Sequence, residues 1–289
     1  MPEELQPRVI RMSDLLGEFV NDAAARHEAR LTGKPMGAVT GFPKLDDALG
    51  GSLAPGLHIL HGSPGSGKTA FALQVAALCE CPALFVTCEM SPIELLRRLT
   101  ARLSGQYLGR FKTGEMTPAE ARSHAERAVA QVPMLSMLDA TRTGILPLDI
   151  RTAAETTRRL CPGNPHLLIV IDSVHSWVRA FSAGLEEYSA LTAGLDALRT
   201  IAQEMNCAVL GIGERNRASM QAGGQSAAAG TRSFEYSSES VIELEAKKEP
   251  VDADGRTRVE VLLSKNRNGS PGKRVVMLFT GSLQDFREE

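Results

Sequence analysis

A short glycine-rich stretch carries the clearest chemical signal in this sequence. Gly62-Ser63-Pro64-Gly65-Ser66-Gly67-Lys68-Thr69 fits the pattern G-x-x-x-x-G-K-[ST]. In such a loop the backbone N–H groups and the positive end of the following helix face phosphate, and glycines let the backbone approach the anion. Lys68 is predicted to reach the β- and γ-phosphates, and the Thr69 hydroxyl to ligate Mg²⁺. We therefore expect this stretch, together with Ala70, to bind ATP with Mg²⁺.

The residues on either side place this loop between a strand and a helix. Leu57-His58-Ile59-Leu60-His61 is typical of a buried strand, and apolar residues recur at helical spacing from Ala70 to Leu78. An ordinary glycine turn would not explain Lys68-Thr69 at the start of a helix, so the context favours a phosphate-binding loop.

Two carboxylates follow other apolar runs. Asp172 ends the run that starts at Leu167, which places it at the carboxyl end of a central strand, where open α/β sheets bind ligands. It is predicted to hold Mg²⁺, directly or through water, with a helix cap as the alternative. Glu89 follows the strand predicted over residues 83–88. It is predicted to orient and activate the attacking water; the alternative is an acid that favours the dipole of the next helix.

Composition excludes several classes of protein. The chain has 289 residues with a net charge of −2, so any contact with nucleic acid must come from a local patch or a central channel. Its five cysteines form no C-x-x-C pair, which indicates reduced core thiols rather than a metal site or disulfides. No apolar run is long enough to span a bilayer. The sequence therefore predicts a cytoplasmic protein with no membrane partner.

The order of the predicted elements indicates the fold class. Buried strands alternate with helices, which predicts an α/β fold with a mainly parallel central sheet flanked by helices. Strands predicted over 241–244, 259–264 and 274–279 follow closely, so we expect antiparallel strands at the C-terminal end. Residues 1–37 are predicted to be an N-terminal extension with an amphipathic helix over 14–27, and residues 38–289 an ATPase domain. The apolar stripe of that helix needs a partner, either its own core or a neighbouring subunit.

Together these motifs resemble the motor domain of replicative DnaB-type helicases. The resemblance covers residues 38–289 and rests on residues 40–46, 67–73, 88–91, 169–172 and 264–269, although single motifs are shared with RecA and RadA. It implies a RecA-like P-loop fold, hexameric rings around single-stranded DNA, and hydrolysis at subunit interfaces. It also implies that Glu89 is the catalytic base, and that Lys265 and the arginine finger Arg267 reach the next subunit's nucleotide. The N-terminal helix would then pack on the adjacent subunit.

The residues themselves support part of this. Lys265 and Arg267 lie two apart at an extended strand end, so both can point at one anion; the alternative is a basic strand end on the surface. An arginine finger that acts in trans requires an oligomer, since a monomer would lack part of its transition-state stabilisation.

The sequence also departs from the helicase pattern. Glu214 stands where the family usually places a glutamine that senses the γ-phosphate, and an ionised glutamate cannot donate a hydrogen bond. Residues 1–37 are too few for the N-terminal domain through which such helicases meet primase, so we expect a stand-alone motor or a reduced relative. Asp172-Ser173-Val174-His175 is nearer to the RecA and RadA wording, and His175 is either a sensor or a packed residue.

Contact with DNA is predicted at a Ser, Gly and Ala-rich segment, residues 217–231, which has no periodicity and is expected to be a mobile loop. Its flanking polar residues could grip a DNA backbone, with ordinary solvated loop charges as the alternative. They are Arg215, Asn216, Arg217 and Arg232.

The sequence thus predicts an ATP-hydrolysing, ring-forming helicase or translocase on single-stranded DNA, with replication or recombination proteins as further partners. The alternative is a RadA-like or KaiC-like ATPase whose nucleotide state controls assembly with a protein. A small-molecule kinase is disfavoured because no lid or acceptor-base motif is evident.

Overall fold

The computed structural model describes residues 9–181, 186–214, 234, 236–247 and 255–289. The chain divides into two units, Met1–Met36 and Gly37–Glu289. In the first unit, a 3-10 turn at Met12–Leu15 leads into α1, Leu16–Thr32, which ends at Gly33 in a left-handed conformation. The predicted N-terminal helix is therefore confirmed, but it continues beyond residue 27. The apolar side chains of Leu16 and Phe19 are largely exposed.

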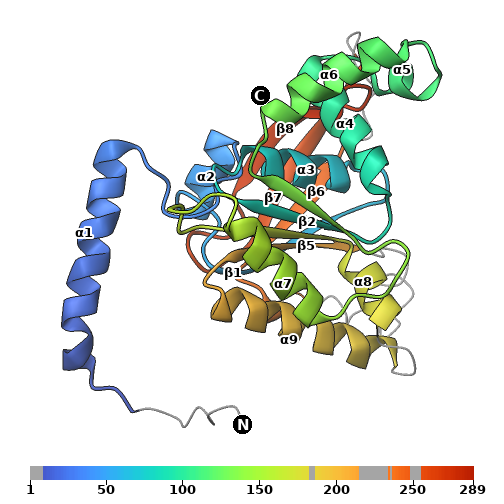
Figure 1. Cartoon of the computed structure of the whole chain (residues 1–289). Coiled ribbons are helices and arrows are strands. Elements are labelled where there is room, and N and C mark those ends of the chain that lie inside the picture. Colours follow the sequence, from blue (N-terminus) through green and yellow to red (C-terminus); the bar gives the residue numbers. More distant parts are fainter. Residues whose placement is uncertain (1–8, 182–185, 215–233, 235, 248–254) are drawn as a thin grey trace. The chain divides into compact units, whose positions relative to one another are not determined.

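The described part of the second unit is built on a nine-stranded sheet of order β3-β2-β4-β5-β1-β6-β7-β8-β9 (Figure 1). The pairs from β3 to β6 are parallel, and those from β6 to β9 are antiparallel. The predicted change from parallel to antiparallel strands is confirmed. The strands are β1 Gly56–Gly62, β2 Ala83–Thr87, β3 Leu135–Asp139, β4 Leu168–Asp172, β5 Ala208–Glu214, β6 Ser240–Ala246, β7 Arg256–Asn266, β8 Arg274–Thr280 and β9 Asp285–Glu288.

Helices cover both faces of the sheet, as predicted. Side chains alternate along each strand, so in β2 Phe85 joins one hydrophobic cluster while Leu84 and Val86 join the other. The first cluster includes α2, α3 and α4, and the second includes α7, α8 and α9 (Figure 1). The helices are α2 Pro43–Leu49, α3 Lys68–Leu78, α4 Pro92–Ser104, α5 Leu108–Lys112, α6 Pro118–Ala130, α7 Pro147–Arg158, α8 Val174–Phe181 and α9 Glu187–Glu204.

Local signals set several helix ends. Thr117 caps α6 in a capping box: its hydroxyl accepts from the Glu120 N–H at 3.3 Å, and the Glu120 carboxylate accepts from the Thr117 N–H at 2.9 Å. The sequence analysis missed the short elements α2, α8 and β9, since each has too few residues to show a clear periodicity.

The last strand packs against the helix that follows the glycine-rich loop. The Gln74 side chain of α3 forms two hydrogen bonds with the backbone of Phe286, both 2.8 Å long. The Phe286 ring stacks on Phe279 at 4.2 Å and meets Phe71 edge-on at 5.4 Å. Strand β9 therefore lies four strands from β1 in sheet order, yet it braces the helix next to β1.

Within the described residues, no helix combines the length and apolar character needed to cross a membrane. The five cysteines are free thiols.

Candidate active site

The glycine-rich loop joins the end of β1 to the start of α3. Gly65 and Gly67 have φ of 80° and 88°, a left-handed conformation that favours glycine. A Cβ on Gly67 would lie 2.9 Å from the Phe286 ring, so only glycine fits there. The Lys68 ammonium donates to the carbonyls of Gly62 at 2.9 Å and Ser63 at 3.2 Å, which keeps it beside the loop. The buried Ser66 closes the turn by donating its N–H to the same Ser63 carbonyl at 3.1 Å.

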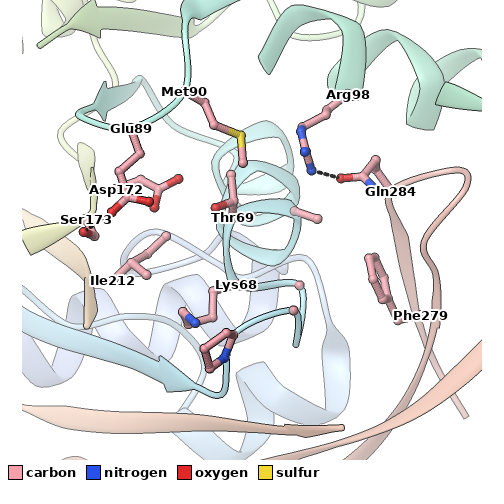
Figure 2. Close-up of a pocket in the computed structure, with 14 residues that line it drawn as sticks. Lys68, Thr69, Glu89, Met90, Arg98, Asp172, Ser173, Ile212, Phe279 and Gln284 are labelled. Atoms are coloured by element: carbon pink, nitrogen blue, oxygen red, sulfur yellow. Dashed lines mark hydrogen bonds between the residues drawn. The ribbon is translucent and has the colours of Figure 1, made fainter. Parts of the chain in front are cut away.

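A cavity of about 400 Å³ opens beside this loop (Figure 2). This volume falls within the range of about 300–1,000 Å³ that is usual for small-molecule sites. The cavity brings together the loop, the two predicted carboxylates and several residues from distant segments. Its lining consists of Pro64, Gly65, Gly67, Lys68, Thr69, Ala70, Glu89, Met90, Arg98, Asp172, Ser173, Ile212, Phe279 and Gln284.

Asp172 ends β4 and is only 3% exposed. Burial raises the pKa of its carboxyl to about 6; the Thr69 hydroxyl bonds to it and opposes the rise, while the charge of Glu89 adds to it. Its Oδ2 atom is buried and has no hydrogen-bond partner among the described residues. A buried carboxylate oxygen without a partner is costly, and a cation would satisfy it. The Thr69 and Asp172 oxygens thus fit Mg²⁺, which prefers oxygen ligands.

Glu89 follows β2, which is the direct neighbour of β4, with Thr87 opposite Asp172. The expected placement of the two carboxylates on neighbouring strand ends is therefore confirmed. The Glu89 carboxylate accepts hydrogen bonds from the hydroxyls of Ser173 and Ser176, at 2.5 and 2.7 Å. Its side chain is thus held toward the start of α8 and the cavity (Figure 2). This contact does not match the alternative in which Glu89 serves the N-terminus of the next helix.

The sequence analysis missed several lining residues. Arg98 of α4 donates to the Gln284 side chain at 2.5 Å across one side of the cavity (Figure 2). It also lies 3.4 Å from Glu94, one helical turn earlier. The i,i+4 spacing of Glu94 and Arg98 was visible in the sequence, but the approach of Gln284 from the turn before β9 was not. The pattern Ser173-x-x-Ser176 is the signal that could have located the two hydroxyls beside Glu89, because residues i and i+3 share a helix face.

Lys265 and Arg267 lie at the opposite edge of the sheet. Strand β6 runs parallel to β1 with Ser240 opposite His58 and Leu244 opposite Gly62, and Asn266 of β7 pairs with Ser240. We call the side of the sheet where β1, β2 and β4 end the carboxyl edge, and the side where β1 and β6 begin the amino edge. Along β7 the amino edge is about 20 Å from the glycine-rich loop, at about 3.3 Å per residue.

Both cations contact their own chain there. The Lys265 ammonium donates to the Ser238 carbonyl at 2.6 Å. The Arg267 guanidinium pairs with Glu239 at 2.8 Å and donates to the Tyr236 carbonyl at 3.4 Å. The structure therefore brings Lys265 and Arg267 to one segment, residues 236–239, and not to the cavity of the same chain.

The remaining predicted site residues lie at the end of β5 or beyond it. The backbone of Glu214 pairs with Gly62, at the head of the glycine-rich loop. The side chain of Glu214 lies outside the described part of the structure, as do Arg215, Asn216, Arg217 and Arg232. The His175 ring lies 5.4 Å from the ring of Phe234 and is not part of the cavity lining.

Comparison with known proteins identifies the family. The model of the DnaB-like helicase C terminal domain matches residues 37–288. The chain belongs to this family. Among curated proteins it is similar to the replicative DNA helicase DnaB of Treponema pallidum (strain Nichols), with 25% identity over 282 residues, covering 95% of this chain and 61% of that protein. The DnaB of Synechocystis sp. is 30% identical over 188 residues, covering 63% of this chain and 21% of the relative. The chain thus spans less than two thirds of these relatives.

Solved structures show the same RecA-like fold. An ATPase domain solved on its own superposes with a TM-score of 0.74 at 19% identity, covering 92% of this chain and 97% of that one. A DnaB-like replicative helicase, described with its interactions with primase, gives a TM-score of 0.75 at 18% identity, covering 98% of this chain and 68% of that one. The KaiC-like protein PH0186 from Pyrococcus horikoshii OT3 gives 0.58 at 19% identity, covering 87% of this chain and 97% of that one.

Proposed function

We propose that this chain is a Mg²⁺-dependent ATPase motor that moves on single-stranded DNA as a ring-forming homo-oligomer, with six subunits as in the family it resembles. The observation that carries the ATPase is the convergence of the loop, Thr69, Asp172 and Glu89 at the carboxyl edge around one cavity. It is supported by the unpaired, buried Oδ2 of Asp172, which a metal ion would satisfy.

Each residue has a task in hydrolysis. The loop N–H groups and Lys68 would hold the triphosphate, because they place positive charge where its oxygens lie. Thr69 and Asp172 would hold Mg²⁺, which when bound neutralises charge on the β- and γ-phosphates. Glu89 would orient a water molecule and accept its proton as the water oxygen attacks the γ-phosphorus.

The position of Arg267 supports an oligomeric site. At the amino edge, about 20 Å along the strand from its own loop, Arg267 is too far away to serve the cavity of its own chain. A neighbouring subunit that presents its amino edge to this cavity would supply Lys265 and Arg267 to the γ-phosphate. The exposed apolar side chains of α1 would support the same assembly by packing on a neighbour.

DNA is proposed as the track because this chain resembles replicative DNA helicases over most of its length. Contacts with replication or recombination proteins, including a primase, are proposed on the same ground. The regulatory alternative keeps one specific observation in its favour: Glu214, whose backbone pairs with the head of the loop, stands where the family usually has glutamine.

One experiment separates the two functions. The ATPase rate of the purified chain is measured with and without single-stranded DNA at two salt concentrations, and the particle mass is measured by light scattering. A motor predicts a ring-sized particle, DNA-stimulated hydrolysis and DNA binding that weakens with salt. Hydrolysis that is indifferent to DNA in every salt would instead support the regulatory ATPase, and the absence of any hydrolysis would sink both.

A further inference from the structure

The hydroxyls of Ser173 and Ser176 form a small network with Glu89. Both donate to the same atom, Oε1, at 2.5 Å from Ser173 and 2.7 Å from Ser176. The two hydroxyls lie 3.2 Å apart, and the Ser173 hydroxyl accepts from the Ser176 N–H at 3.3 Å. Within the described residues, Oε2 of Glu89 takes no part in this network. The two oxygens of the carboxylate are therefore chemically different in this structure.

The surroundings of Glu89 require such a restraint. Its carboxylate lies at the mouth of a cavity, beside the carboxylate of Asp172, and the charge of one affects the other. A glutamate side chain rotates about three bonds, and like charges favour rotamers in which it swings away. Hydroxyl donors that point at one carboxylate oxygen stabilise the charged group and fix its rotamer.

We propose that Ser173 and Ser176 are positioning residues that hold Glu89 in the orientation required to deprotonate the attacking water. Both hydroxyl protons stay on the serines and point at Oε1, which leaves Oε2 to accept the proton. In the step itself a water O–H bond breaks and its proton goes to Oε2. The water oxygen bonds to the γ-phosphorus, and the bond to the bridging oxygen breaks and leaves its electrons on ADP. This inference rests on the proposed ATPase function.

The two serines differ in what else they do. Ser173 is 2% exposed, and its hydroxyl also receives the N–H of Ser176 at the start of α8. Its removal would disturb the helix end as well as Glu89. The hydroxyl of Ser176 bonds only to Ser173 and Glu89 among the described residues, and alanine is a good helix former. Ser176 is therefore the cleaner position for a test.

The test compares Ser176→Ala with Ser176→Thr, which restores a hydroxyl, and with Ser123→Ala, which removes an exposed helical serine elsewhere. We expect Ser176→Ala to lower kcat about tenfold while the KM for ATP and the binding of a non-hydrolysable ATP analogue stay within about twofold, because only the orientation of the base is lost. Ser176→Thr should recover most of kcat, and Ser123→Ala should match the wild type.

A double-mutant cycle with Glu89→Gln decides whether Ser176 acts through Glu89. In the Gln background, single-turnover hydrolysis over long incubation should change less than about twofold on adding Ser176→Ala, since the carboxylate is already gone. Equal losses in both backgrounds, an unchanged kcat in Ser176→Ala, or a parallel loss of analogue binding would overturn the inference and leave the ATPase in place. A wild-type chain that hydrolyses no ATP would instead overturn the proposed function, and this inference with it.

Discussion

The two edges of the central sheet differ in how their charged groups are satisfied. At the carboxyl edge, Lys68, Asp172 and Glu89 surround an open cavity, and Asp172 keeps a buried oxygen without a partner among the described residues. At the amino edge, Lys265 and Arg267 already bond to residues 236–239 of their own chain. The carboxyl edge is thus arranged for a ligand, whereas the amino edge must exchange partners before it can contact one.

The exchange at the amino edge costs little. The side chain of Arg267 is 50% exposed in its pair with Glu239, and exposed ion pairs contribute about 0–1 kcal/mol. A phosphate group on a neighbouring subunit is a stronger acceptor, since it carries more charge than a carboxylate. One edge therefore supplies a preformed site, and the other supplies cations that become available on assembly.

The largest expected effect is at the carboxyl edge. Lys68→Ala removes the ammonium beside the loop, and we expect ATP turnover to fall by at least about 10³-fold. The control is Lys273→Ala, because Lys273 is an exposed lysine outside this cavity. Turnover measured by phosphate release checks the prediction, and persistence of hydrolysis in Lys68→Ala would contradict the assignment of the site.

A similar loss is expected from the amino edge, but of a different kind. Arg267→Ala should lower turnover by about 10³-fold while ATP binding is largely kept, because the finger acts on the transition state of another subunit. Arg274→Ala is the matched control, since Arg274 is exposed and also pairs with a glutamate at 2.8 Å.

Mixing subunits tests whether the finger acts in trans. Oligomers assembled from Arg267→Ala and Glu89→Ala chains should regain some activity, because some interfaces then combine an intact Glu89 with an intact Arg267. If the mixture stays as inactive as its parts, the two edges do not share a site.

An intermediate effect is expected from pH at the carboxyl edge. Below a pKa of about 6 the Asp172 carboxyl is protonated, so the affinity for Mg²⁺ should fall about tenfold per pH unit as the pH decreases further. In the metal-free chain the sign is opposite for stability: the raised pKa means that the folded state holds the proton more tightly. The contribution of Asp172 to the unfolding free energy therefore decreases as the pH rises from about 4 to 6.

The measurement is the rise in Tm produced by Mg²⁺ with ATP, taken from pH 5 to 8. Asp172→Asn should remove both the rise due to Mg²⁺ and its pH dependence. Asp46→Asn is the control, because burial also raises the pKa of Asp46 to about 6 although it lies outside the cavity lining. A Mg²⁺ effect that stays constant down to pH 5 in the wild type would contradict the role of Asp172.

The smallest effect is expected from Glu239→Gln at the amino edge. Loss of the exposed pair should change the unfolding free energy by less than about 1 kcal/mol. Turnover should rise slightly, by up to about threefold, since Arg267 no longer has to leave a carboxylate. A large fall in turnover would show that Glu239 positions the finger rather than competes for it.

The sequence predicted the groups whose signals are local. The loop from Gly62 to Thr69 and the acids Glu89 and Asp172 follow apolar strands, and parallel strands end at the same edge of a sheet, so their convergence could be inferred. The β/α alternation indicated the sheet and its covered faces for the same reason.

What the sequence did not reveal depends on contacts between distant segments. Gln284 reaches Arg98 from the turn before β9, and neither residue carries a pattern that announces the other. The partners of Lys265 and Arg267 were missed because residues 236–239 meet them only through the pairing of β6 with β7. The roles of Glu214 and of the arginines predicted to contact DNA remain predictions.

The hydrogen bonds between Gln74 and Phe286 also bear on when the protein becomes able to bind nucleotide. They join residues 212 positions apart, and the Phe286 ring lies against the glycine turn of the loop. A chain still emerging from the ribosome would hold the whole loop sequence long before β9 exists to brace it. Contacts of such separation form late because their loop-closure cost comes first. Nucleotide binding would then favour the completed chain, and ATP present during synthesis would stabilise the final folding step.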